Sequence, residues 1–295
     1  MTWLDEVLHE LAAAKEWGYH QGQPTSAEPT AFAALALIAN GQTSAAKHAL
    51  EWLVEHQATD GSIGVTETQN TPIWPTSLAI LAWKKAAETT NSNRYASAIA
   101  RGADALLQVQ AVTIPVSDVF GHDTSLVGWP WVAGTHSWLE PTSFAVLAFK
   151  AIGQENHPRV RAGVKLIIDR LLPEGGANYG NTFVLGQRLR PHVQPSGIAL
   201  AAIADEPSDF DGRIQRTVKY LRTELSGETT TSSLSFALLG LGVAKALPDE
   251  ADDWLVAAAS RTLARDSAPY KMALLALAAK ASELPLQSRR SVASV

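Results

Sequence analysis

The stretch Gly128–Phe149, GWPWVAGTHSWLEPTSFAVLAF, decides the fold that we predict for this chain. Its first half is rich in Trp and Gly, as in a loop, and its second half begins a helix at Glu140-Pro141-Thr142. Pro at the first helical position loses no hydrogen bond, and a polar residue just before it can cap the free N–H groups. The residues that follow are small and apolar. We therefore expect a loop that leads into a buried helix.

The same helix opening recurs along the chain. It is found as Glu28-Pro29-Thr30, Trp74-Pro75-Thr76 and Gln194-Pro195-Ser196, and weaker versions begin near residues 231 and 268. Each opening leads into a segment rich in Ala and Leu, such as 33–37. A unit that repeats every few tens of residues is typical of folds built from successive helix pairs.

Two kinds of helix alternate in the predicted structure. Helices with one apolar face are expected at about 2–17, 43–57, 94–110, 157–172, 209–225 and 250–265. Helices that are apolar on nearly all sides are expected at about 29–39, 75–88, 141–152, 195–204, 231–246 and 268–281. This alternation predicts an all-α fold, a single (α/α)6 toroid over residues 1–295, with the apolar helices inside and the amphipathic helices outside. An open solenoid of helix pairs needs the same alternation and is the structural alternative.

The connectors place the candidate site. Links from inner to outer helices are short, whereas links from outer to inner helices are long at about 18–28, 58–74, 111–140 and 173–194. In a ring of antiparallel pairs all connectors of one kind lie on one face, and long loops in compact domains are usually functional. The inner helices begin on that same face, so their positive dipole ends meet there. We expect the site at this mouth.

Composition excludes several classes of function. The 295 residues are 46% hydrophobic, carry a net charge of −5 and include no Cys, which excludes disulfides, thiolate metal sites and a Cys nucleophile. Without a basic run, nucleic acid is not an expected partner. No phosphate loop or dinucleotide fingerprint occurs, and we expect no cofactor. The acidic start, Met1–Glu6, does not resemble a signal peptide, and no apolar run reaches the ~20 residues of a membrane span. We expect a soluble cytoplasmic protein.

The long loops and the helix starts supply the candidate substrate-binding residues. They are mainly aromatic, with a few polar groups, as in a pocket for an apolar ligand. Aromatic faces can also stabilise a carbocation. The candidates are Trp17, Tyr19, His20, Glu28, Trp74, Trp129, Trp131, Trp138, Asn178, Tyr179 and His192. The alternative is that these Trp residues only fasten the loops to the rim.

Several segments resemble repeats of a known superfamily. Residues 49–57, ALEWLVEHQ, followed by Asp60-Gly61-Ser62-Ile63, resemble the QW repeat of squalene–hopene and other triterpene cyclases, and 101–110 and 175–181 resemble further copies. The Pro-Thr helix starts also resemble repeats that these cyclases share with protein prenyltransferase β-subunits. The resemblance covers about 29–245. It implies an (α/α)6 barrel with an apolar central cavity, and an isoprenoid as the small apolar substrate.

The resemblance also implies a catalytic position. Class II terpene cyclases protonate their substrate with a DxDD-Thr motif just before an inner helix, and the matching place here is Trp138–Thr142. The aligned acid is Glu140, with His136 as its candidate partner, whereas the supporting carboxylates are absent. The hypothesis is an acid-initiated cyclase or isomerase. The prenyltransferases bind zinc partly through Cys, which this chain lacks, and we expect no metal; a site from Asp118, His122, Asp123 and His136 is the alternative.

Other functions remain open. One is a non-catalytic barrel that binds a lipid or a partner protein. Another is a carbohydrate-active (α/α)6 enzyme with two carboxylates across an aromatic cleft, for which Glu28, Glu67 and Glu140 are the candidates. Glu28 and Glu140 also precede Pro at helix starts, where a carboxylate stabilises the helix dipole. The apolar face of the first helix, which includes Trp3, Leu4, Val7 and Leu8, predicts either ordinary packing or a peripheral membrane contact.

Overall fold

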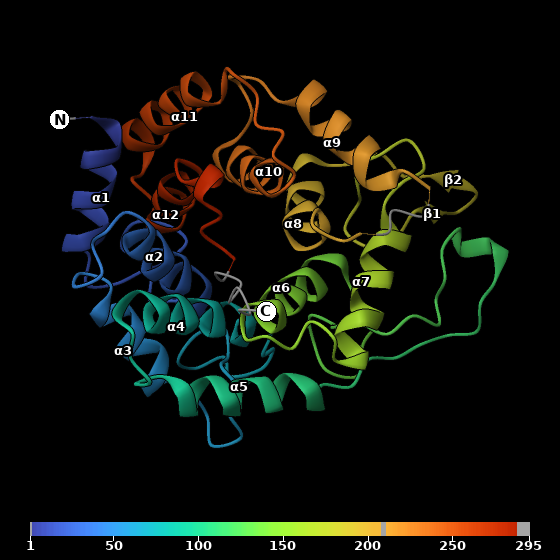
Figure 1. The fold of residues 1–295 in the computed structure, drawn as a ribbon, viewed down its shortest axis with the longest axis horizontal. Coiled ribbons are helices and arrows are strands. Elements are labelled where there is room, and N and C mark those ends of the chain that lie inside the picture. Colours follow the sequence, from blue (N-terminus) through green and yellow to red (C-terminus); the bar gives the residue numbers. More distant parts are fainter. Residues whose placement is uncertain (1, 208–210, 288–295) are drawn as a thin grey trace, which may run out of the picture.

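The fold is two concentric rings of helices, seen end-on in Figure 1. The computed structural model describes residues 2–207 and 211–287, without the side chain of Asp118. The inner ring holds α2 (Ala27–Ala39), α4 (Thr76–Thr90), α6 (Leu139–Ala151), α8 (Val193–Ile203), α10 (Thr231–Val243) and α12 (Pro269–Ala278). The outer ring holds α1 (Trp3–Ala13), α3 (Lys47–Glu55), α5 (Ala96–Gln108), α7 (Pro158–Arg170), α9 (Arg213–Glu224) and α11 (Ala251–Arg265).

The inner ring is closed. Each inner helix packs against the next one along the chain, and α12 packs against α2, so that the last inner helix meets the first. The prediction of an all-α (α/α)6 toroid is therefore confirmed, and the open solenoid is wrong. The remaining elements are two short 3-10 helices, η1 (Asp118–Phe120) and η2 (Ala281–Glu283), and an antiparallel hairpin of β1 (Phe183–Val184) and β2 (Gln187–Arg188) in which Phe183 pairs with Arg188.

Burial explains why the two kinds of helix alternate. Every residue of α6 is buried except Lys150, because the helix is surrounded by its two ring neighbours, an outer helix and the axis. An outer helix such as α9 buries only Ile214, Thr217 and Leu221, which recur at the spacing of one helix face. The sequence pattern thus follows from how many sides of each helix meet water.

The axis of the inner ring is filled by three phenylalanines. Phe32, Phe144 and Phe236 come from α2, α6 and α10, which are not neighbours in the ring. Their ring centroids nevertheless lie 5.7 to 6.2 Å apart in all three pairs, so the side chains meet at the centre. Each is at most 2% exposed. At this level the axis holds protein side chains instead of the open apolar cavity that the resemblance implied.

The repeated Pro-Thr and Pro-Ser openings have a structural role. The side-chain oxygens of Thr76, Thr142 and Ser196 accept hydrogen bonds from the backbone N–H groups of Ile63, Trp129 and Ala177, at 2.8, 2.9 and 2.8 Å. Each bond ties the loop before an inner helix to the first turn of that helix. Because the bonds are buried, they satisfy backbone groups that would otherwise lose their hydrogen bonds on leaving water.

The far end of the ring is covered by the chain that follows α12. As far as Gln287, this segment runs from α12 toward the middle of the ring in Figure 1. Leu286 is 6% exposed, and the carbonyl of Gln287 accepts a hydrogen bond from Nζ of Lys85 near the end of α4, at 3.2 Å. The beginnings of the inner helices lie at the opposite end of the ring, which is the mouth.

The apolar face of α1 packs on the rings. Val7 is fully buried and Leu8 is 6% exposed, and the helix contacts α11, α12 and α2. Trp3 and Leu4 are partly buried against the same core. This face is thus used for packing, and a peripheral membrane contact stays a prediction. No helix within the described ranges has the length and apolarity required to cross a membrane.

Replacing Gly61 by Ala is expected to destabilise the fold by about 2–4 kcal/mol. Gly61 has a φ of +90°, and a Cβ there would lie 2.3 Å from the carbonyl oxygen of Arg101 in α5, so both the conformation and the contact require glycine. Gly41 is the matched control, because it has a φ of +76° with no atom within 4 Å of an added Cβ. Urea unfolding should show a smaller loss, about 1–2 kcal/mol, for Gly41→Ala. Equal losses would contradict the close approach to α5.

Candidate functional site

Four inner helices place a carboxyl, amide or phenol side chain at the mouth in the same position, the second residue of the helix. These residues are Glu28 of α2, Glu140 of α6, Gln194 of α8 and Tyr270 of α12. Glu28 and Glu140 stand four residues, about one turn, before the phenylalanines that fill the axis. Both glutamates are 8% exposed. These four residues and Tyr19, from the loop before α2, together form what we call the carboxyl cluster.

Glu28 is held by two phenols. The hydroxyl of Tyr19 donates to Oε2 of Glu28 at 2.5 Å, and the hydroxyl of Tyr270 donates to Oε1 at 3.3 Å. The two phenol rings also contact each other, with centroids 5.2 Å apart. Next to Tyr19, His20 lies 2.9 Å from the carboxylate of Asp266, which fastens this loop to the segment before α12. Glu28 is therefore positioned by residues from both ends of the chain.

Glu140 has fewer partners. Gln194 supplies its side-chain hydrogen bond, whereas Oε1 is buried and has no hydrogen-bond partner within the described part of the chain. A buried carboxylate oxygen without a donor is costly, but a protonated carboxyl group avoids most of this cost. The environment of Glu140 therefore favours the acid form.

The pKa values of both glutamates are raised to about 7. For Glu28 the main cause is burial; the bond from Tyr19 lowers the pKa, and the charge of Glu140 raises it again. For Glu140 burial raises the pKa and the bond from Gln194 lowers it. The charge on Glu140 therefore disfavours ionisation of Glu28. Near neutral pH, such a pair can hold one proton between two carboxyl groups.

Two indoles stand next to the cluster. Trp74, just before α4, packs edge-on against Trp131 with ring centroids 4.9 Å apart, and it stacks on Phe144 at 6.2 Å. Both indoles are partly exposed. They therefore offer apolar surface to a ligand at the mouth, on the side of α4 and α6.

Other predicted substrate-binding residues fasten loops instead. Trp17 is 1% exposed against His48 of α3, and Trp129 is 2% exposed with its indole N–H donating to the carbonyl of Leu106 at 2.9 Å. Asn178 donates to the carbonyl of Arg190 at 2.8 Å within its own loop. For these residues the loop-fastening alternative describes the geometry. Tyr179 and His192 contact each other on the exposed rim, with ring centroids 5.5 Å apart.

The structure does not bring His136 to Glu140. His136 is exposed and, with Trp138, lines a separate pocket at the outer side of the rim. Gln194 is the hydrogen-bond partner of Glu140 instead. The pairing of His136 with Glu140 was inferred from four residues of separation, but His136 and Ser137 form β-bridges with Val112 and Pro130 before α6 begins. Glu67, the third carboxylate considered for sugar chemistry, is exposed in its loop and lies outside the cluster.

Sequence reasoning did not select Tyr270 or Gln194. Gln194 stands in the same Xaa-Pro-Ser/Thr opening as Glu140, so this repeat could have placed it at the mouth. Tyr270 follows the Pro of a weaker opening, and it reaches Glu28, 242 residues away in sequence, only because the ring closes.

Within residues 2–207 and 211–287, no group of three or more His, Asp or Glu residues could hold a metal ion. The alternative site at His122, Asp123 and His136 also involved Asp118, whose side chain lies outside the described residues.

Replacing Tyr19 by Phe is expected to raise the pKa of Glu28 by about one unit, because a hydrogen bond to a carboxylate stabilises its charged form by about 1.5–3 kcal/mol and part of this is regained by rearrangement. Titration of the Glu28 side-chain carbon by ¹³C NMR measures the change. Tyr179→Phe is the control, since Tyr179 is exposed on the rim. An unchanged titration in Tyr19→Phe would show that this phenol does not act on Glu28.

Comparison with known proteins yields the fold alone. No family model matches the chain, and no curated protein sequence matches it. Among solved structures, it is similar to an α-1,6-mannanase of Salegentibacter sp. HEL1_6, with 15% identity and a TM-score of 0.63 over 95% of this chain and 99% of the other. Cellobiose 2-epimerase from Spirochaeta thermophila shares 12% identity, with a TM-score of 0.57 over 93% and 96%.

The same ring also occurs within a longer protein. Salmonella α-2-macroglobulin shares 14% identity with a TM-score of 0.53, over 94% of this chain but 17% of that one. None of the three proteins named here is a terpene cyclase, and identities this low show a common architecture only. This chain has the (α/α)6-toroid fold that carbohydrate-active enzymes and a macroglobulin also contain.

Proposed function

We propose that this protein is a carbohydrate-active enzyme that hydrolyses glycosidic bonds with Glu28 and Glu140. The proposal is carried by one observation. Two nearly buried carboxyl groups with pKa values raised to about 7 lie at the mouth of the ring, and the charge of Glu140 raises the pKa of Glu28. Glycosidases need one carboxyl group that is protonated at working pH and one that is ionised.

The hydrogen bonds of the cluster support different roles for the two glutamates. Glu140 acts as the general acid, because its Oε1 has no donor among the described residues and its burial favours the protonated form. Glu28 acts as the carboxylate base, because the phenols of Tyr19 and Tyr270 both donate to it. In hydrolysis Glu140 gives its proton to the leaving glycosidic oxygen. Glu28 takes a proton from the water that attacks the anomeric carbon.

The surroundings of the cluster support a sugar as substrate. Trp74 and Trp131 are partly exposed, and Trp74 stacks on Phe144, which follows Glu140 by about one turn of α6. The C–H faces of a pyranose pack well on such rings. The phenylalanines one turn deeper close the axis, so the site is shallow and suits a ring held at the mouth. The likeness to a mannanase and to a cellobiose epimerase adds an analogy at the level of the fold.

The test is an assay of purified protein against a panel of α- and β-linked glucans and mannans, with release of reducing ends and product identity as readouts. We expect new reducing ends from at least one glycan with wild type and none with Glu140→Gln. Isomerised sugar without new reducing ends would show that the reaction is epimerisation and not hydrolysis. No turnover of any glycan would overturn the proposal.

A second candidate is acid-initiated cyclisation or isomerisation of an isoprenoid. The burial of Glu140 next to Trp74 and Trp131 favours it, because alkene protonation needs a protonated carboxyl group and aromatic faces stabilise the resulting cation. The phenylalanines at the axis restrict the space for a long chain. Solvent extraction and mass spectrometry compare wild type with Glu140→Gln. A polyprenyl species that accumulates only in the variant would support this candidate, whereas the same lipid in both would indicate a binding protein.

A further inference from the structure

A second pocket lies on the outer side of the rim, away from the carboxyl cluster. Its volume is about 240 Å³, and the connectors 109–138 and 171–192 form its walls beside the end of α7. No residue of the carboxyl cluster lines it. The walls are mainly apolar and include Ile114, Phe120, Leu126 and Trp138. His122 and Arg170 add polar groups to the same lining.

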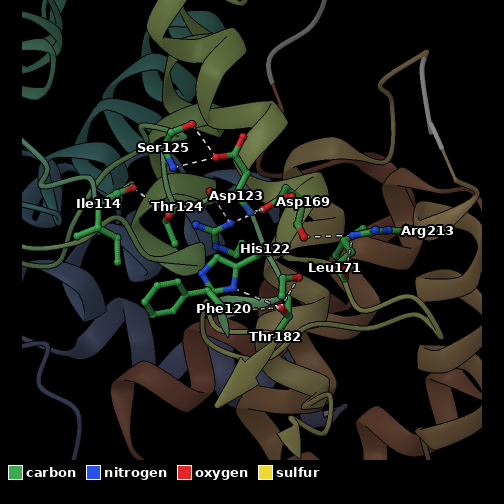
Figure 2. A network of polar contacts seen from close by, with 12 residues as sticks. Ile114, Phe120, His122, Asp123, Thr124, Ser125, Asp169, Leu171, Thr182 and Arg213 are labelled. Atoms are coloured by element: carbon green, nitrogen blue, oxygen red, sulfur yellow. Dashed lines mark hydrogen bonds and ion pairs between the residues drawn. The ribbon is translucent and has the colours of Figure 1, made fainter. Parts of the chain in front are cut away.

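The loop that carries this pocket is fixed by a polar network, shown in Figure 2. The carboxylate of Asp123 accepts bonds from the backbone N–H and the hydroxyl of Ser125, at 2.8 and 2.6 Å. The backbone N–H of Asp123 donates to Asp169 of α7 at 3.0 Å, and its carbonyl accepts from Arg170 at 3.1 Å. These bonds lock the loop onto the end of α7. The pocket is therefore formed before any ligand binds.

His122 presents a hydrogen-bond acceptor to the pocket. The hydroxyl of Thr182 donates to the carbonyl of Gly121 at 2.9 Å and lies 3.2 Å from Nδ1 of His122. Because the Thr182 hydroxyl uses its proton in this bond, its oxygen accepts a hydrogen bond from Nδ1–H of His122. This assigns the neutral His122 tautomer that has a lone pair on Nε2. Burial, together with the charge of Arg170, lowers the pKa of His122 to about 4, so the ring is neutral at pH 7.

Arg170 presents donors beside that acceptor. Its side chain is 5% exposed, and Nη1 is engaged by the carbonyl of Asp123 and by the carboxylate of Asp169. The other N–H groups of the guanidinium have no hydrogen-bond partner in the part of the chain that the structure describes. These N–H groups are not enclosed by protein, so they remain available to a ligand in the pocket that Arg170 lines.

We propose that this pocket binds one neutral, hydroxylated ring of monosaccharide size. A hydroxyl group both donates and accepts, so it can bond to Nε2 of His122 and to Arg170 at once. The apolar face of the ring packs on Trp138 and Phe120. The volume of 240 Å³ is at the small end for ligand pockets and holds a single ring with its substituents.

The charges at the pocket favour a neutral ligand over an anion. Asp169 already pairs with Arg170, and Asp123 adds a second carboxylate next to the same guanidinium. A carboxylate ligand would be attracted by Arg170 but repelled by both aspartates, and the repulsion cancels most of the attraction. A ligand that carries hydroxyls and no charge fits the site without this opposition.

The experiment titrates methyl α-mannoside, methyl β-glucoside and benzoate by saturation-transfer NMR. All proteins carry Glu140→Gln, so that turnover at the carboxyl cluster does not interfere and binding here is judged independently of the proposed function. His122→Leu removes the acceptor, Leu126→Trp fills the pocket, and His9→Leu on the exposed side of α1 is the matched control. Circular dichroism establishes that each variant is folded.

We expect at least one glycoside to bind with a Kd of about 1–10 mM, the range for a ligand of about a dozen heavy atoms. Its affinity should fall at least tenfold in His122→Leu, disappear in Leu126→Trp and stay unchanged in His9→Leu. If Leu126→Trp does not fold, His122→Leu decides alone. Glycoside binding that neither variant weakens would place the sugar elsewhere and overturn the inference. Binding of benzoate alone would identify an anion site, and binding of no probe would also overturn it.

Discussion

Replacement of Glu140 by Gln is expected to lower the turnover of a cleaved glycan by about 10³-fold or more, with little change in KM. Gln keeps the size of the side chain and can still bond to Gln194, but it has no proton to give to the leaving oxygen. Removing a general acid of this kind removes an interaction made only in the transition state. The measurement is kcat and KM on the glycan that the panel identifies.

Two controls separate this effect from a loss of structure. Glu67→Gln changes an exposed glutamate of a rim loop and should retain full activity. A glycoside with a good leaving group, such as a nitrophenolate, needs little protonation when the bond breaks. The rate of the Glu140→Gln variant on such a glycoside should therefore be closer to that of wild type. An equal loss on good and poor leaving groups would contradict the role of Glu140 as the acid.

Stability is expected to fall as pH rises from about 4.5 to about 7. The folded pKa of each glutamate, about 7, lies above the unfolded value of 4.5. The folded state therefore binds these protons more tightly, and the stability they contribute is complete below pH 4.5 and lost through pH 7. A shift of this size corresponds to up to about 3 kcal/mol for each group.

The double variant Glu28→Gln/Glu140→Gln provides the comparison, because it cannot titrate at either position. Urea unfolding at pH 4.5, 6 and 8 should show its free energy of unfolding rising relative to wild type across this interval. Other carboxyl groups titrate equally in both proteins and cancel in the difference. A difference that does not change with pH would mean that neither pKa is raised.

The helix alternation and the ring were predictable because the number of buried sides of each helix determines which of its residues are apolar. An inner helix such as α6 meets protein on every side, and an outer helix such as α9 meets it on one, so the two patterns differ at a glance. The Xaa-Pro-Thr openings were visible for a related reason. Their hydroxyls fasten each loop to an inner helix, as Thr142 does for Trp129. The same segments carried the resemblance to terpene cyclases, and their role in the structure is to build the ring.

The candidate site was predictable only in part. Glu140 was selected because it aligns with the acid of class II terpene cyclases, and Glu28 because it lies at the predicted mouth. The phenol of Tyr270 joins Glu28 through ring closure, which no local pattern encodes. Trp74 and Trp129 look alike in sequence, since each precedes a Pro near an inner helix. Only packing shows that Trp74 lies at the mouth and that Trp129 is buried between helices. The filling of the axis likewise depends on three phenylalanines meeting from alternate helices.

The central claim is that Glu28 and Glu140 share their protons near neutral pH. Site-resolved ¹³C NMR titration of the two carboxyl carbons in wild type, assigned with the single Gln variants, tests it most directly. The account predicts midpoints about 7 for both groups, with the Glu28 midpoint moving down in Glu140→Gln because a neighbouring charge is lost. Two independent midpoints near the ordinary value of 4.5 would contradict it.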